Sequence, residues 1–305
     1  MPGNTLDHRG LRFITDDTEA ADVVVVINYS KYDAEFEARA GYVWNWHNEP
    51  IVRTPFAKGY DRIYTHVTTS RDPRVRNAPP ILDWWVDGTF DELAQQKPPK
   101  KTKKLSAIAS TKTLIPGHKL RNDFIALLEQ KFPDIDVFGH GRAHSLANKS
   151  QGLLPYEYSI AIENTSTPHY WTEKIADCFL SYTVPVYFGA TNISEYFPDG
   201  SIIWLDLNDF DRAKHTIERV LTEDDWNTRL PALQEARDMI LSNYSLYGQI
   251  SRAIKAEEEV IRNAPRTTTT VHGRRTKPGG WIRGVGLAGN IRSRLERRRQ
   301  RLSRQ

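Results

Sequence analysis

The sequence predicts an α/β fold with two units, because short apolar strands alternate with amphipathic helices along most of the chain. The strand candidates include Asp22–Asn28, which is rich in β-branched residues, and Val184–Phe188. The segment Lys119–Phe132 has its large apolar residues on one helical face. Such alternation favours parallel sheets covered by helices on both faces. At 305 residues, the chain is long enough for two domains.

The N-terminal part predicts a first α/β domain over residues 1–100. After Asp22–Asn28, two further strands are expected at Tyr42–Trp46 and Asp61–His66. The segment Gln95–Lys104 (QQKPPKKTKK) is polar, basic and contains proline, which is typical of an interdomain linker. We therefore place a domain boundary near residue 100.

A second strand–helix pattern predicts an α/β domain over residues 101–262. Strands are expected at Leu105–Ala109, Asp136–Phe138, Ser159–Ile162, Val184–Phe188 and Ile202–Leu205. Helices are expected at Lys119–Phe132, Ile175–Tyr182, Ala213–Leu221 and Trp226–Ser242.

Residues 263–305 are predicted to form a basic tail. Residues 266–305 carry 12 Lys and Arg against one acid, Glu296, so the rest of the chain is net acidic. Within residues 281–304, apolar residues fall on one helical stripe amid arginines, a pattern suited to an anionic membrane surface. The alternative is a disordered basic tail without a fixed partner. Nucleic acid is the less favoured partner, because the basic excess is confined to this tail.

The remaining sequence signals favour a cytoplasmic protein, peripheral on the inner face of the membrane if the tail binds there. The first ten residues lack an apolar signal-peptide core, and the longest early aliphatic run, Val23–Ile27, is too short to span a bilayer. Cys178 is the only cysteine, which excludes an internal disulfide. Its place on the apolar face of an expected helix predicts a buried thiol.

The segment Leu154–Gly189 concentrates polar residues between two apolar elements. Glu163, Asn164, Tyr170, Glu173 and Lys174 lie where a strand ends and a helix begins. In α/β sheets, ligands bind at that edge. The free N–H groups of a helix N-terminus favour anions, so a lysine in the first turn is unfavourable unless an anion binds there.

Arg121 repeats this arrangement at the helix that follows Leu105–Ala109. Two cations at two helix starts of one sheet domain predict a clamp for a diphosphate, in which Arg121 offers a planar fork and Lys174 a point charge. Either residue alone would be read as a solvated surface cation.

The same segments resemble the donor-binding motif of the α1,3/α1,4-fucosyltransferases, glycosyltransferase family 10. The matching residues are Ile162-Glu163-Asn164, Tyr170-Trp171-Thr172-Glu173-Lys174 and Val184-Pro185-Val186-Tyr187-Phe188-Gly189, in the family's order and spacing. The segment Lys119–Phe124 is similar to the family's Arg-x-x-Phe helix start.

The resemblance implies a GT-B architecture, with two Rossmann-like domains facing a cleft and a GDP-sugar donor held by the second domain. It implies that Arg121 and Lys174 neutralise the pyrophosphate and that Glu173 binds ribose hydroxyls. Asn164 and Tyr170 would position the diphosphate and the sugar. Glu163 would orient the loop or face the fucose. No cofactor or metal site is implied.

An inverting transfer also needs a base to take the proton of the acceptor hydroxyl. The family places a carboxylate for this in the N-terminal domain. Here the candidate is Glu49, which follows a strand in the segment Trp44–Pro50. His47 is the alternative, because imidazole can accept a proton near neutral pH.

We therefore expect an inverting α1,3-type fucosyltransferase that transfers fucose from GDP-fucose to a hydroxyl of a glycan. A transferase for another GDP-sugar and a non-catalytic GDP- or glycan-binding relative are the alternatives. The acceptor glycan is not indicated, because such contacts come from variable loops.

Overall fold

The computed structural model describes residues 7–14, 19–30, 32–50, 59–81, 83–223 and 225–273. These residues divide into two compact units. One contains Ile81–Arg252 together with the segment up to Phe13, and the other contains Ile14–Pro80 together with the segment from Ala253. The chain therefore passes between the units near residues 13, 80 and 252, positions other than the predicted boundaries at 100 and 262.

The larger unit is built on a five-stranded parallel sheet with the order β12-β11-β10-β8-β9. Its strands are β8 (Lys103–Ile108), β9 (Asp136–Phe138), β10 (Tyr156–Ile162), β11 (Val184–Phe188) and β12 (Ile203–Trp204). Its main helices are α2 (Pro116–Lys131), α3 (Glu173–Leu180), α4 (Phe210–Thr222) and α5 (Trp226–Met239), the last continued by the π-helix Ile240–Tyr244.

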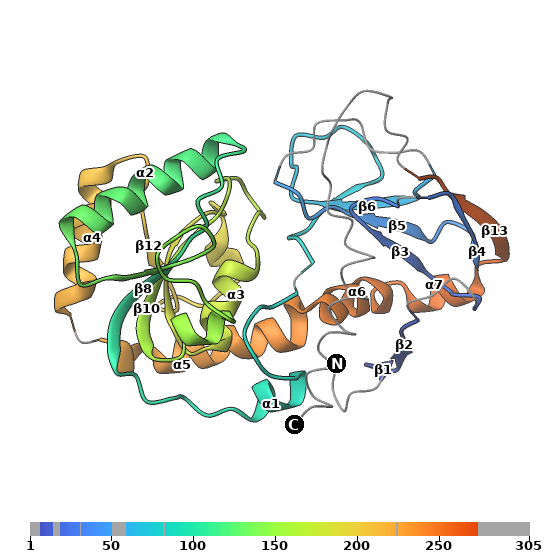
Figure 1. The fold of residues 1–305 in the computed structure, drawn as a ribbon. Helices are drawn as coiled ribbons and strands as arrows, with labels where there is room; N and C mark the ends of the chain where they lie inside the picture. Colours follow the sequence, from blue (N-terminus) through green and yellow to red (C-terminus); the bar gives the residue numbers. More distant parts are fainter. Residues whose placement is uncertain are drawn as a thin grey trace. The chain divides into compact units, whose positions relative to one another are not determined.

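Helices cover both faces of this sheet, as the alternating pattern predicts. Helices α2 and α4 lie side by side (Figure 1), and the ring of Phe124 on α2 is 5.5 Å from that of Phe210 on α4. Helix α3 packs against α5. The sheet runs from β8 outward to β9 on one side and from β10 outward to β11 and β12 on the other. The direction of winding thus reverses between β8 and β10, the position at which open α/β sheets bind ligands.

The smaller unit has a four-stranded parallel sheet with the order β3-β5-β6-β7. Its strands are β3 (Val24–Ile27), β5 (Val43–Trp46), β6 (Arg62–Thr65) and β7 (Val75–Asn77). Strands β4 (Ala34–Arg39) and β13 (Arg266–Val271) form a separate antiparallel pair. Helix α7 (Glu258–Asn263) also belongs to this unit, and α6 (Leu246–Lys255) runs across the division of the chain at residue 252.

The predicted α/β fold class is confirmed, and the predicted central strands appear within a few residues of their expected bounds. The sequence analysis missed β4, β7, α1 (Phe90–Gln95), α6, α7 and the short hairpin of β1 (Asp7–His8) and β2 (Leu11–Arg12). Most of these elements are short or largely exposed, so they lack a strong apolar period. Helix α6 is the exception: it is amphipathic, with Gly248, Gln249, Ile250 and Ser251 buried, and the sequence analysis overlooked that pattern.

The basic segment Gln95–Lys104 is not an interdomain linker. Both of its flanks belong to the larger unit, and Lys101 Nζ donates to the carbonyl oxygens of Leu154 and Ser181 at 3.1 and 2.8 Å. The sequence misleads here because a lysine that donates hydrogen bonds to backbone carbonyls looks the same, in the sequence, as a lysine exposed to solvent.

The first part of the tail predicted from residue 263 is a strand, β13. Thr267–Thr270 pair with β4 within β13, because β-branched threonines suit an extended strand. The segment 281–304, for which a membrane surface was predicted, lies outside the described residues. Among the residues that the structure describes, no helix is both long and apolar enough to cross a bilayer.

Candidate functional site

The candidate site lies at the carboxyl edge of the five-stranded sheet, where the winding direction reverses. Glu163 and Asn164 follow β10 directly, and the loop that begins there leads to α3. Arg121 lies on α2, the helix that follows the neighbouring strand β8. It is the sixth residue of α2 and not at the helix start that the sequence predicts, because the helix already begins at Pro116. The sheet order thus brings together two segments that are 43 residues apart: Arg121 Nη1 donates to Asn164 Oδ1 at 3.2 Å.

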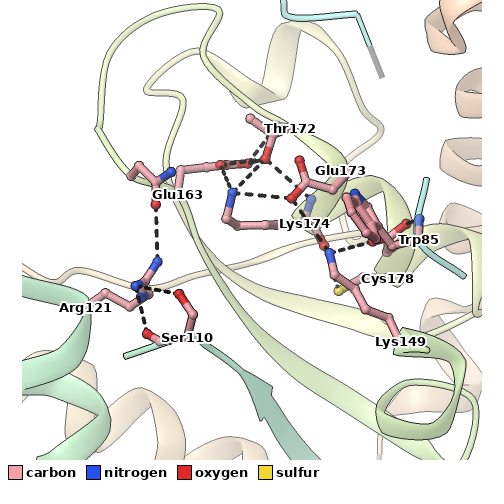
Figure 2. Close-up of polar contacts among 11 residues, drawn as sticks. Trp85, Ser110, Arg121, Lys149, Glu163, Thr172, Glu173, Lys174 and Cys178 are labelled. Atoms are coloured by element: carbon pink, nitrogen blue, oxygen red, sulfur yellow. Dashed lines mark hydrogen bonds and ion pairs between the residues drawn. The ribbon is translucent and has the colours of Figure 1, made fainter. Parts of the chain in front are cut away.

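Glu163, Thr172 and Lys174 form a compact polar cluster (Figure 2). Glu163 Oε1 accepts from the Thr172 amide at 2.7 Å, and Oε2 accepts from the Thr172 hydroxyl at 2.8 Å and from Lys174 Nζ at 3.1 Å. Lys174 Nζ also donates to Thr172 Oγ1 at 3.0 Å, while Thr172 caps α3. These bonds hold the ammonium of Lys174 at the start of α3.

The Glu163 side chain is fully buried, whereas the Lys174 side chain is 21% exposed. Burial raises the pKa of Glu163 above its ordinary value, and the neighbouring Lys174 opposes that rise. Burial alone would lower the pKa of Lys174, but the carboxylates of Glu163 and Glu173 outweigh it and raise that pKa. Lys174 is therefore a cation at neutral pH, with one side accessible to a ligand.

A second layer of charge supports this cluster. Lys149 Nζ lies 3.7 Å from Glu173 Oε1 (Figure 2). It also lies 2.7 Å from Asp177 Oδ2. Asp177 Oδ1 also accepts from the Trp85 amide at 2.8 Å. Burial raises the pKa of Asp177 to about 6, against the effect of Lys149, so the carboxylate is ionised at neutral pH. Sequence reasoning missed Lys149 and Asp177, although an acid on the apolar face of α3 was a visible signal.

Glu173, which the sequence assigned to ribose hydroxyls, lies at the first turn of α3 with 28% of its side chain exposed. Burial alone would raise the pKa of its carboxyl, but Lys174 and Lys149 outweigh burial and lower it to about 2. Glu173 therefore presents a charged carboxylate that can accept hydrogen bonds.

Arg121 is a buried cation whose partners are neutral oxygens. It is 5% exposed, and Nη2 donates to the Ser110 carbonyl at 2.9 Å, while Nε has no hydrogen-bond partner among the residues that the structure describes. Burial, together with Arg142, lowers the pKa of its guanidinium, which disfavours the charged form. An anion bound here would offset that cost.

Helix α2 approaches this loop very closely. A Cβ added at Gly117 would lie 1.9 Å from the Asn164 carbonyl oxygen, so only glycine fits there. The first turn of α2 has no acidic residue and no side-chain cap. Burial and the nearby cations Arg121, Lys112 and Lys174 together lower the pKa of His118. Arg121, Lys112 and Lys174 are thus near enough to His118 to disfavour a further positive charge there. Sequence reasoning missed His118 and Lys112.

The other predicted residues lie as follows. Tyr170 is 2% exposed, so its ring packs in the interior. Glu49 and His47 follow β5 in the smaller unit, at the carboxyl end of its parallel sheet, and Glu49 is exposed. Burial, with a contribution from His66, lowers the pKa of His47 to about 4, so its imidazole is neutral at pH 7.

Metal ligands do not gather at this site. In the described part of the chain, no group of three or more His, Cys, Asp or Glu side chains could hold a metal ion. Asp136, one of two aspartates with DxD-like spacing, instead pairs with Lys103 at 2.8 Å and accepts from the Tyr156 hydroxyl at 2.7 Å. As predicted, Cys178 is a buried free thiol.

Comparisons with known proteins agree with the predicted resemblance. Residues 98–229 match the family model described as glycosyltransferase family 10 (fucosyltransferase), C-terminal part. An α-(1,3)-fucosyltransferase of Helicobacter pylori is 32% identical over 104 residues, which are 32% of this chain and 21% of that protein. An α-(1,4)-fucosyltransferase of Arabidopsis thaliana is 44% identical over 48 residues, 16% of this chain and 12% of that protein. These alignments thus span about a fifth or less of the relatives' lengths.

A crystal structure of an α1,3-fucosyltransferase with GDP is similar in fold. It superposes with a TM-score of 0.51 at 20% identity, covering 85% of this chain and 82% of that one. At this identity the similarity establishes the fold alone, and that fold is the GT-B type that the sequence predicts. The resemblance to family 10 is confirmed over the segment that carries Arg121, Glu163 and Lys174.

Proposed function

We propose that this protein is an inverting glycosyltransferase of the family 10 type that transfers fucose from GDP-fucose to a hydroxyl of a glycan. The proposal rests chiefly on one observation: two cations from neighbouring strand–helix segments contact adjacent residues, Arg121 on Asn164 and Lys174 on Glu163. A nucleoside diphosphate carries the charge that such a pair accommodates.

In the proposed reaction, the anomeric carbon of fucose is attacked by the acceptor hydroxyl and the bond to the β-phosphate breaks. Negative charge then develops on the departing GDP, and fixed cations stabilise that charge in the transition state. Lys174 supplies one cation from the first turn of α3 and Arg121 the other from α2. Because the hydrogen bonds to Glu163 and Thr172 already hold Lys174, little reorganisation is needed when charge develops.

Asn164 and Glu173 complete the proposed donor site. Asn164 lies between Arg121 and the buried Glu163, where its amide would contact the diphosphate. The charged, part-exposed Glu173 would accept hydrogen bonds from ribose hydroxyls. Of the two roles expected of Glu163, its full burial favours orientation of the loop over contact with fucose. For Tyr170, burial favours support of the loop from within.

The proton of the acceptor hydroxyl would go to Glu49, an exposed carboxylate at the end of β5. His47 is the alternative base, since its imidazole is neutral at pH 7. An imidazole whose conjugate acid has a pKa of about 4 is a weak base, so His47 is the less favoured of the two.

The donor is tested by isothermal titration calorimetry with GDP, GDP-fucose and GDP-mannose. We expect GDP and GDP-fucose to bind. Lys174→Ala and Arg121→Ala should each lower the affinity for GDP by at least about tenfold, since each removes a charged contact to phosphate. Tighter binding of GDP-mannose than of GDP-fucose would favour the other GDP-sugar. Tight binding of GDP without transfer or hydrolysis of GDP-fucose would identify a non-catalytic relative, and indifference to GDP would contradict the proposal.

We further propose a cytoplasmic location with the basic segment 281–304 on an anionic membrane surface. Its support is the charge and apolar spacing of that segment alone. Co-sedimentation with vesicles of anionic and of neutral lipid tests it, with a chain ended after Gly273 as the control, because this truncation leaves β13 intact. Equal binding of both chains would contradict the role of the segment.

A further inference from the structure

An open groove of about 310 Å³ lies beside the β12 edge of the five-stranded sheet. Its lining includes Thr191, Ser194, Phe197, Asp199, Ile202 and Trp204. Trp204 is the most unusual of these residues, because its large indole is 44% exposed at the end of the sheet's outermost strand. The volume is that of a small-molecule site at the lower end of the usual range.

The groove is built on rigid parts of the larger unit. Phe197, on its floor, is 3% exposed, and its ring lies 5.0 Å from that of Trp171 and 4.8 Å from that of Phe179. On its rim, the Ser201 hydroxyl donates to the Pro198 carbonyl at 2.7 Å, and Arg229 Nη1 donates to the Gly200 carbonyl at 2.9 Å. These contacts hold Phe197 and the turn that carries Asp199 in place.

The chemistry of the lining selects a neutral, hydroxyl-bearing ligand. The lining residues of the groove, all of them in the described part of the chain, include one carboxylate, Asp199, and no cation. The guanidinium of Arg229 on the rim is already paired with Asp225 at 2.7 Å. The groove therefore offers no unpaired cation to a phosphate or nucleotide, and Asp199 would repel one. The hydroxyls of Thr191 and Ser194 and the Asp199 carboxylate can exchange hydrogen bonds with hydroxyl groups. The exposed indole of Trp204 offers a flat apolar surface. A pyranose ring combines an apolar face of C–H groups with a rim of hydroxyls.

We propose that this groove is an accessory carbohydrate-binding site, in which a neutral pyranose of a glycan stacks on Trp204 and donates hydroxyl hydrogen bonds to Asp199. The preference for a sugar over another neutral ligand rests on the proposed glycan transfer.

The segment 189–197 links this groove to the loop of the candidate donor site. On the donor side, the Ser166 hydroxyl donates to the Gly189 carbonyl at 2.9 Å, and the His169 amide donates to Asn192 Oδ1 at 2.7 Å. On the other side, Thr191, Ser194 and Phe197 line the groove. A glycan held here would thus lie on the same unit as the donor and within one loop of it.

The test is saturation-transfer NMR, with titration calorimetry, of the full chain against lactose, maltotriose and chitotriose. We expect at least one of these neutral sugars to bind. Trp204→Ala should weaken it about tenfold, the loss typical of a central tryptophan contact. Asp199→Asn should weaken it less, and the affinity should be insensitive to salt because the ligand is uncharged.

Trp85→Ala is the matched control, because Trp85 is 45% exposed on the same unit and does not line the groove. It should leave sugar binding unchanged, and Trp204→Ala should leave GDP binding unchanged. Sugar binding that depends on Trp204 supports the accessory site even if the wild-type chain does not bind GDP. The experiment therefore distinguishes failure of the sugar site from failure of the proposed donor site.

Three results would contradict the proposed sugar site: none of the three sugars binds, Trp204→Ala binds sugar as well as the wild type, or Trp204→Ala also loses the ability to bind GDP. A fourth contradicting result would come from light scattering, which measures the oligomeric state of the wild type and of Trp204→Ala. A wild-type dimer that dissociates on Trp204→Ala would make the groove a contact between copies of the chain.

Discussion

Lys174 Nζ lies 3.1 Å from Glu163 Oε2, and the carboxylate belongs to the end of a strand whereas the ammonium belongs to the first turn of the following helix. The pair places a fixed cation where the helix dipole alone would disfavour one. The free-energy cost of burying this charge pair is offset by hydrogen bonds, because the Thr172 hydroxyl donates to Glu163 and accepts from Lys174. The proposed donor site is thus charged before any ligand binds.

Glu163→Ala should lower the free energy of unfolding by about 3 to 5 kcal/mol, because it leaves the Lys174 ammonium beside a buried cavity. Glu163→Gln should lower the free energy of unfolding by less, since the amide oxygen still accepts a hydrogen bond from Thr172. Urea unfolding measures both, and GDP titration should show weaker binding for Glu163→Ala. The control is Asp123→Ala, which removes an exposed pair with Lys119 on α2 and should cost less than about 1 kcal/mol. Equal effects of the two alanine variants would contradict the role of Glu163.

Lowering the pH from about 4.5 towards 2 should reduce stability through Glu173. Its pKa is about 2 in the folded protein, below its value of 4.5 in the unfolded chain, so the unfolded chain binds the proton first and acid favours unfolding. The contribution is at most about 3 kcal/mol, present above pH 4.5 and lost as the pH falls through 2. Glu173→Gln should flatten the dependence of the unfolding free energy over this window. A variant with the same slope as the wild type would count against the lowered pKa.

Lys149→Met should destabilise the protein by about 3 kcal/mol or more, since it leaves the fully buried Asp177 without its cation. The double variant Lys149→Met/Asp177→Asn should recover much of that loss, because no unpaired buried charge remains. Thermal unfolding of the two single variants and the double variant gives the coupling between the two residues. Additive effects would show that the 2.7 Å pair contributes nothing specific.

Gly117→Ala should weaken GDP binding without changing any charge. The added Cβ would meet the Asn164 carbonyl at 1.9 Å and push α2 away from the loop, which separates Arg121 from Asn164. Titration calorimetry measures the affinity. Gly41→Ala is a suitable control: it lies in the smaller unit with a φ of +87° and open space around it, so it should cost stability but not GDP affinity. Unchanged affinity in Gly117→Ala would show that the close approach has no part in binding.

The base is identified by comparing Glu49→Gln with His47→Gln. If Glu49 is the base, its variant should lower the rate of transfer by about 10²- to 10⁴-fold and leave GDP affinity unchanged. If His47 is the base, His47→Gln should instead cause that loss of transfer rate. The transfer rate of the wild type should then fall as the pH drops through about 4, the pKa of the His47 imidazole. Full activity in both variants would exclude both residues.

The sequence by itself determined the α/β class, the central strands and the identity of the proposed donor residues. It could do so because these features depend on local periodicity and on short motifs, as at β11 and Thr172–Lys174. The sequence analysis missed the strands β4 and β13 and the role of Lys101. A threonine-rich strand and a partly buried lysine have the same local sequence pattern as a loop.

Only the tertiary structure decided which of the donor residues meet. Sheet order places β8 beside β10, so Arg121 reaches Asn164 across 43 residues of sequence. The three-dimensional packing also made Glu163 a buried partner of Lys174, enclosed Tyr170 and brought Lys149 to Asp177. Burial and long-range pairing depend on how elements pack against one another, and no single segment of the chain carries that information.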